Sequence, residues 1–186
     1  IWYASTLWGL PAIPASLLNS VATGTFIALC AGIAALIFFA PRRPRLVAVL
    51  FLVVAAFAVT NKVYSPQFVI WLVPLAALAR PVWRDFLIWQ AAEITYFMAI
   101  WWFLAGYGIE EAKGMTPQWY AFFTFVHVIA TVWFAGLVVR DALEPDRDIV
   151  RTDGIPADAD DPGGGCLDGA PDALPWLRDH REVSTT

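Results

Sequence analysis

Apolar residues along this chain of 186 residues gather in five runs, which short polar connectors separate. The runs cover residues 21–40, 46–60, 67–79, 86–104 and 117–139. The first run has twenty residues without a charge, and as an α-helix it would extend about 30 Å, the thickness of the hydrocarbon core of a bilayer. The pattern predicts an all-α fold, a polytopic transmembrane helical bundle of about five spans within residues 1–140.

Two of the runs have recognisable starts. Asn19 or Ser20 is suited to cap the first span, because short polar side chains accept hydrogen bonds from the exposed amides of a helix start. Thr116 as the N-cap and Pro117 as the first helical residue predict the start of the fifth span.

Residues 1–20 are rich in aromatic side chains and contain Pro11 and Pro14. They suit either a segment lying at the membrane–water interface, where Trp and Tyr concentrate, or the stub of a preceding span. The first residue is Ile1, and neither a basic segment nor a cleavage pattern precedes the first run. We therefore expect the chain to be the carboxy-terminal part of a longer protein.

Arginines mark alternate connectors. They occur in residues 42–45, in residues 80–84 and from Arg140 onwards, whereas residues 61–67 and 105–116 contain none. Because positively charged loops remain in the cytoplasm, five spans would place the arginine connectors inside and residues 61–67 and 105–116 outside. The expected location is the plasma membrane.

Composition supports a membrane protein with a polar tail. Hydrophobic residues make up 59% of the chain and the mean hydropathy is +0.61, which excludes an ordinary soluble globular protein. Residues 140–186 hold twelve Asp and Glu against five Arg. Because residues 141–186 are rich in Asp, Pro and Gly, they predict a disordered acidic cytoplasmic tail, either inert or docking a cytoplasmic partner.

Residue types argue against several kinds of ligand. No basic face alternates with aromatic residues, so nucleic-acid binding is not expected. Cys30 and Cys166 fit neither a metal-ligand spacing nor a disulfide framework, and we expect no metal and no cofactor.

The connector of residues 61–67 carries the candidate site residues Asn61, Lys62, Tyr64, Ser65 and Gln67. The apolar residues beside it, 46–60 with fifteen residues and 68–79 with twelve, would rise only about 22 and 18 Å as helices. A connector held between them would therefore lie below the outer membrane surface. With Ser65 as N-cap and Pro66 as first helical residue, the next helix would direct its free amides towards Lys62.

A helix amino terminus beside a lysine is an anion site, and Tyr64 and Gln67 add neutral donors for a phosphate or a sugar hydroxyl. We therefore expect an outward-facing cavity for an anionic, lipid-linked ligand. The alternative is a surface hairpin whose Lys62 extends its ammonium group to water.

Ionisable residues also occur within the fourth and fifth runs. Glu93 lies about 12 Å from the cytoplasmic side, with Gln90 one turn away, and His127 of the fifth run is at a depth where it can pair with Glu93. Intramembrane carboxyl groups are costly and often functional, but a hydrogen-bonded Glu that joins two helices is the alternative. Glu110 and Glu111 are expected to be solvated loop charges.

The string Asn61-Lys62-Val63-Tyr64-Ser65-Pro66-Gln67, with its apolar flanks from Thr60 to Leu75, resembles the late signature of glycosyltransferase family 87, a group of polytopic GT-C enzymes. The resemblance extends to Ala79-Arg80-Pro81, to Trp89-Gln90-Ala91-Ala92-Glu93 and to Ile1-Trp2-Tyr3, and it covers roughly residues 1–140. The string of residues 61–67 is its specific part.

This resemblance implies transfer of a sugar, typically mannose, from a polyprenyl-phosphate donor to an envelope glycolipid or polysaccharide. Asn61, Lys62, Tyr64, Ser65 and Gln67 would then face the phosphate and sugar of the donor. GT-C enzymes generally take their catalytic base from the first external loop of the full protein, which these residues do not include. We expect no catalytic residue in this chain, which alone should be inactive.

Two other classes remain open from the residues. In a small transporter or channel subunit, Glu93 and His127 would be the coupling groups. In a membrane scaffold, the acidic tail would bind a cytoplasmic partner.

Overall fold

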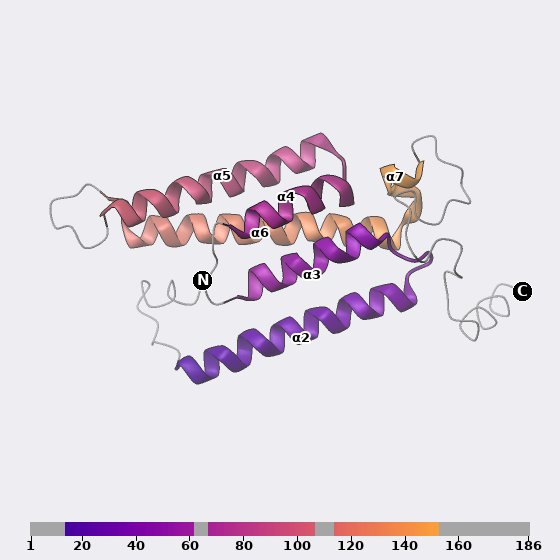
Figure 1. The fold of residues 1–186 in the computed structure, drawn as a ribbon, viewed down its shortest axis with the longest axis horizontal. Coiled ribbons are helices and arrows are strands. Elements are labelled where there is room, and N and C mark those ends of the chain that lie inside the picture. The colour runs from indigo at the N-terminus through magenta and orange to yellow at the C-terminus, as the bar shows by residue number, and fades with distance from the viewer. Residues whose placement is uncertain (1–13, 62–66, 107–113, 153–186) are drawn as a thin grey trace, which may run out of the picture.

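The computed structural model describes residues 14–61, 67–106 and 114–152, in which all regular secondary structure is helical and no strand occurs. Five helices lie side by side, and a short C-terminal segment packs at one end of the bundle (Figure 1). The elements are α2 (Ala15–Phe39), α3 (Leu46–Thr60), α4 (Phe68–Ala79), α5 (Trp83–Gly106), α6 (Pro117–Leu143), the 3-10 turn η1 (Pro145–Arg147) and α7 (Ile149–Thr152). The predicted all-α class is confirmed.

Three of the described helices, α2, α5 and α6, are long and apolar enough to cross a bilayer, which indicates a membrane protein. The other two, α3 and α4, are apolar but shorter. With 15 and 12 residues, α3 and α4 extend about 22 and 18 Å, against about 36 and 40 Å for the 24 and 27 residues of α5 and α6.

The first helix begins earlier than its pattern predicts. α2 starts at Ala15, directly after Pro14, so Asn19 and Ser20 lie inside it and cap nothing. Ser20 Oγ donates instead to the carbonyl of Ser16, at 3.1 Å. Proline has a backbone angle compatible with a helix start, and this signal outweighed the polar pair five residues later.

Two other starts can be compared with their predicted caps. α6 begins at Pro117 after Thr116, in agreement with the prediction, although the Thr116 side chain makes no capping hydrogen bond. α4 begins at Phe68 with Gln67 in the N-cap position. The predicted N-cap Ser65 and first helical residue Pro66 lie outside the described residues.

The predicted disordered tail is wrong at its start. α6 continues to Leu143, and residues 145–152 form η1 and α7. Asp141 and Asp148 are 5% and 6% exposed, because each carboxylate pairs with a buried arginine. The rest of the predicted tail, residues 153–186, lies outside the described residues.

Aromatic side chains fill the centre of the bundle. Phe51 of α3 meets Trp89 of α5 and Phe134 of α6 edge-on, with ring centroids 6.5 and 5.3 Å apart. All three side chains are fully buried and belong to the core that α2 and α4 complete with Leu36 and Leu72. Each of the five helices therefore contributes to one continuous core.

Candidate functional site

The arginine-bearing connectors meet at one end of the bundle, which we call the Arg end. Arg45, before α3, binds Asp148, and Arg80, after α4, binds Asp141 at the end of α6. Arg151 of α7 donates to the carbonyl of Arg43 at 2.7 Å. If successive spans cross the membrane in opposite directions, the three arginine-bearing connectors lie on the same side. In the structure these three connectors are in direct contact.

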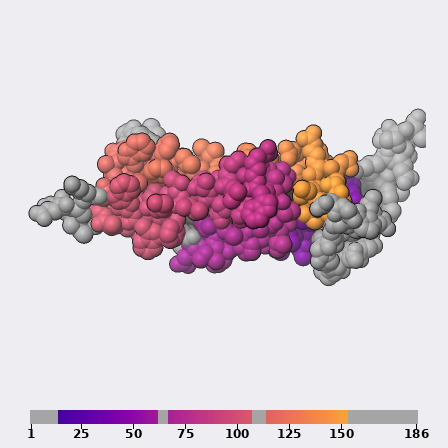
Figure 2. Space-filling view, turned by 90° about the horizontal axis from the view of Figure 1, so that it is seen from above, coloured from indigo at the N-terminus to yellow at the C-terminus, as the bar shows by residue number. Residues whose placement is uncertain are grey.

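At the opposite end, α3 and α4 stop short of their neighbours. Because all five helices reach the Arg end, the end of α3 at Asn61 and the start of α4 at Gln67 lie roughly 14–22 Å below the far ends of α5 and α6. Figure 1 shows this offset, and in Figure 2 the magenta surface around α4 lies next to the orange C-terminal segment. We call the region beside Asn61 and Gln67 the recess.

A cavity of about 400 Å³ opens at the recess between α2 and α3. Its polar lining comes from Asn19, Thr23, Thr60 and Asn61, and its apolar lining from Ala22, Phe26 and Phe57. Amide and hydroxyl groups can hydrogen-bond a sugar or a phosphate. Of the predicted donor-binding residues, Asn61 lines this cavity and Gln67 is exposed outside it, while Lys62, Tyr64 and Ser65 lie outside the described residues.

A buried polar cluster joins α5 to α6. His127 Nδ1 lies 2.7 Å from Glu93 Oε1, which also accepts a hydrogen bond from Thr131 Oγ1 at 3.0 Å. Trp89 Nε1 donates to the same Thr131 hydroxyl at 3.2 Å, and Tyr96 stacks on the His127 ring with centroids 4.8 Å apart. These five side chains are at most 1% exposed.

The expected contact between Glu93 and His127 is therefore present, but Glu93 lies deeper in the bundle than the roughly 12 Å expected from the sequence. Since α5 begins at Trp83, Glu93 is ten residues into the helix, about 15 Å from the Arg end and near its middle. Gln90 stays outside the cluster, and its side-chain oxygen has no hydrogen-bond partner among the described residues. The second oxygen of Glu93, Oε2, also has none there.

A carboxyl and an imidazole in contact can hold or exchange one proton, and the same contact fastens two helices together. Neither Glu93 nor His127 lines a cavity described at the recess. Within the described residues, no three His, Cys, Asp or Glu side chains are placed to hold a metal ion.

Sequence reasoning missed the ion pairs at the Arg end. Arg45 binds Asp148 through two hydrogen bonds, of 2.7 and 3.1 Å, and donates to the carbonyls of Leu78 and Ala79 at 3.1 and 2.6 Å. Arginine near the last carbonyls of a helix satisfies their hydrogen bonding and complements the helix dipole. Arg45 thus joins the start of α3, the end of α4 and the segment before α7.

Arg80 forms the second half of these ion pairs. It donates to Asp85 Oδ2 from Nε and Nη2, at 3.0 and 2.8 Å, and to Asp141 from Nη1. Burial alone would lower the pKa of Arg80, but the hydrogen bonds to Asp85 and Asp141 and their charges raise it overall. Arg80 therefore keeps its charge although it is 6% exposed.

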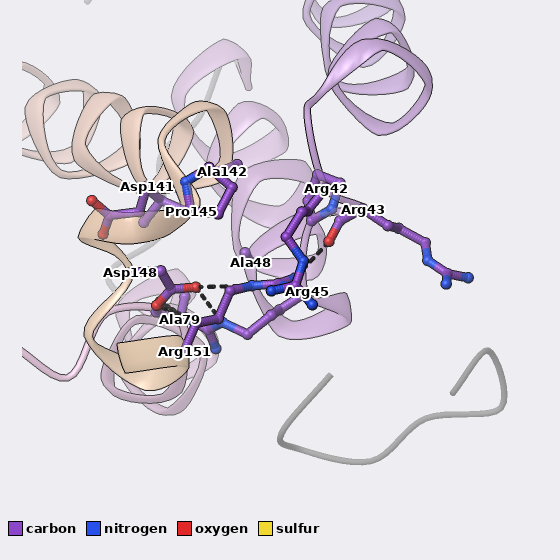
Figure 3. Close-up of a pocket in the computed structure, with 12 residues that line it drawn as sticks. Arg42, Arg43, Arg45, Ala48, Ala79, Asp141, Ala142, Pro145, Asp148 and Arg151 are labelled. Carbon is purple, nitrogen blue, oxygen red and sulfur yellow. Dashed lines mark hydrogen bonds and ion pairs between the residues drawn. The ribbon is translucent and has the colours of Figure 1, made fainter. Parts of the chain in front are cut away.

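Figure 3 shows Arg45 and Arg151 converging on Asp148 at this end. The space that these residues enclose is about 10 Å³, room for about one water molecule. The ion pairs of the Arg end are therefore a structural closure and have no room for a ligand among them.

No family model, no curated protein and no solved structure matches this chain. The resemblance to glycosyltransferase family 87 rests on the residues quoted for it, and the function that it implies is a proposal.

Proposed function

We propose that the chain is the carboxy-terminal membrane part of a GT-C-type glycosyltransferase. This enzyme moves a hexose, mannose being typical of the resembling family, from a polyprenyl-phosphate donor to an envelope glycan or glycolipid. The observation that carries the proposal is the recess, where two short helices stop inside the bundle at Asn61 and Gln67 beside a cavity with a polar lining.

The recess has properties that a lipid-linked donor needs. All five helices act as spans in this proposal, with the Arg end in the cytoplasm and the recess open to the outside. Irregular backbone at membrane depth is tolerated where it lines a water-filled cavity. The phosphate and sugar of a donor can enter the recess while the prenyl chain stays in the surrounding lipid.

Lys62 is the residue assigned to the donor phosphate, because it is the one cation in the sequence of residues 61–67. Asn61, with Thr23 and Asn19 of the cavity lining, offers amide and hydroxyl groups to the sugar. The general base comes from a part of the enzyme outside these 186 residues, so this chain supplies donor binding alone.

The proposal is tested with Lys62→Ala and Lys62→Arg in the full-length protein that contains this chain. We expect Lys62→Ala to raise the KM for polyprenyl-phosphate mannose in a membrane transfer assay, and Lys62→Arg to restore most donor affinity. Lys113→Ala is the matched control. Lys113 is the only other lysine in the sequence, and it belongs to the second external connector. Unchanged turnover and donor affinity in Lys62→Ala would remove the phosphate role.

The depth of the recess has its own test. Tyr64→Cys, treated with a membrane-impermeant thiol reagent, should react more slowly than a cysteine on the open surface. Labelling at the rate of a surface thiol would support the hairpin alternative.

A second function, a proton-coupled transporter or channel subunit, is favoured by the position of the Glu93–His127 pair at mid-depth between two spans. Such a protein would act with these helices alone. Reconstitution of the chain in liposomes would then give a proton or solute flux that Glu93→Gln abolishes, and absence of flux would reject this function.

A further inference from the structure

A larger cavity, of about 620 Å³, lies between α2, α3 and α6 on the face of the bundle that includes α2. We call it the groove. Apolar side chains line it except at Thr131, and Gly32 of α2 and Gly136 of α6 are part of its wall. A methyl group added to either glycine would meet no atom within 4 Å. The groove is therefore open space that side chains of the described residues do not fill.

The groove has the length of one leaflet. Its lining runs from Ala28 to Ala40 along α2 and from Thr131 to Leu143 along α6, thirteen residues that rise about 18 Å from first to last in each helix. Half of the roughly 30 Å hydrocarbon core is about 15 Å. Both Ala40 and Leu143 are at the Arg end, so the groove extends from that end to the middle of the bundle.

The rim at the Arg end is positively charged. Arg42 and Arg43 follow Ala40, and Arg140 lies in α6 one turn from Gly136 and from Leu143. The Arg140 side chain is 39% exposed. Arg140 also contacts the carboxylate of Asp141 at 3.4 Å, although that carboxylate is buried against Arg80. Asp148 is buried against Arg45, and the half-exposed Glu144 beside Leu143 pairs with Arg147.

We propose that the groove binds one acyl chain of an anionic phospholipid, whose phosphate lies at Arg42, Arg43 and Arg140. Apolar lining matches a hydrocarbon chain, the length matches one leaflet, and the rim charge matches an anionic head group. Basic pockets between spans on the cytoplasmic side attract anionic lipids in this way. The proposal rests on membrane insertion with the Arg end towards the anionic leaflet, and it does not depend on sugar transfer.

The test uses the full chain reconstituted in bilayers with spin-labelled phosphatidylglycerol or spin-labelled phosphatidylcholine carrying the same chains. Electron paramagnetic resonance measures the immobilised fraction of each lipid. We expect the protein to retain phosphatidylglycerol more strongly, and the preference to fall about five-fold for each arginine removed in Arg42→Gln, Arg43→Gln and Arg140→Gln.

Two matched controls separate the groove from general charge and general bulk. Arg84→Gln removes a cation that is 80% exposed at the same end but on α5, and should leave the preference unchanged. Gly136→Leu fills the groove and should abolish the retained phosphatidylglycerol. Gly24→Leu also enters open space but lies outside the groove lining, and should not.

Equal retention of the two lipids would overturn the proposal, as would an unchanged preference in the three arginine variants. A Gly136→Leu variant that retains phosphatidylglycerol would place the lipid elsewhere. Cross-linking of Gly136→Cys to residues 1–13 or to a second copy would show that protein occupies the groove, and would also overturn it.

Discussion

Removing the charge of Arg45 is the most informative perturbation of the fold. The residue is 6% exposed and makes two hydrogen bonds with Asp148 and two with the carbonyls that end α4. Arg45→Met keeps an apolar stem but leaves the Asp148 carboxylate buried without its main partner. Breaking a buried ion pair from one side typically costs about 3–5 kcal/mol, and we expect the free energy of unfolding to fall by that amount.

A double-mutant cycle separates the ion pair from the helix-end contacts. Asp148→Leu should also destabilise, whereas Arg45→Met combined with Asp148→Leu leaves neither charge buried. We expect the double variant to lose at least about 2 kcal/mol less than the sum of the single losses. Arg147→Met is the control, because Arg147 pairs with Glu144 with both side chains about half exposed, and such pairs contribute about 0–1 kcal/mol.

The free energies are measured on protein in mixed micelles by titration with sodium dodecyl sulfate, followed by tryptophan fluorescence. If Arg45→Met cost no more than Arg147→Met, the reasoning from burial would be refuted. Additive single losses would show that Arg45 acts through the carbonyls of α4 and not through Asp148.

Two further predictions concern the contact between α5 and α6. Gly106→Ala should destabilise the protein in the same titration, because a Cβ on Gly106 would overlap the backbone of Gly114. The control Gly24→Ala meets open space and should stabilise the protein by up to about 1 kcal/mol. Equal effects of the two substitutions would contradict the close approach of Gly106 to Gly114. Glu93→Gln should change the free energy of unfolding by less than about 1 kcal/mol, since an amide oxygen still accepts from Thr131, while Glu93→Leu should cost about 1–3 kcal/mol by leaving the His127 and Thr131 contacts unmade. Similar losses in both variants would show that the charge of Glu93, and not its hydrogen bonding, stabilises the pair.

Much of the helical framework could be predicted because apolar runs and helix-start chemistry are local signals. The bounds of α3 agree with the pattern, and Thr116–Pro117 gives the start of α6. Where two local signals competed, at Pro14 and at Asn19–Ser20, sequence alone did not decide between them.

The ordered segment after residue 140 could not be predicted from composition. Asp141 and Asp148 look like solvated tail charges until their partners, 61 and 103 positions away, are known. The five arginines in the two short connectors, residues 42–45 and 80–84, were the one available signal, because guanidinium groups that become buried need carboxylates. Contacts between residues so far apart are set by packing, which a single sequence does not report.

The candidate site was predicted in outline for similar reasons. Helix lengths counted from the sequence give the recess, and helical spacing brings Glu93 near the depth of His127. The contribution of Asn19 and Thr23 to the cavity at the recess was missed, because the sequence does not show that α2 extends past the end of α3.

The shortness of α4 has a consequence for the lipid that surrounds it. α4 presents Ile70, Trp71 and Leu78 at its surface, each more than half exposed, on a helix only about 18 Å long. A hydrophobic strip shorter than the roughly 30 Å bilayer core is accommodated by local thinning of the membrane. Thinning beside α4 brings the head-group layer down towards the recess and shortens the path of a membrane-anchored phosphate into it. Under the proposed function, hydrophobic mismatch would therefore guide a lipid-linked donor to one side of the bundle.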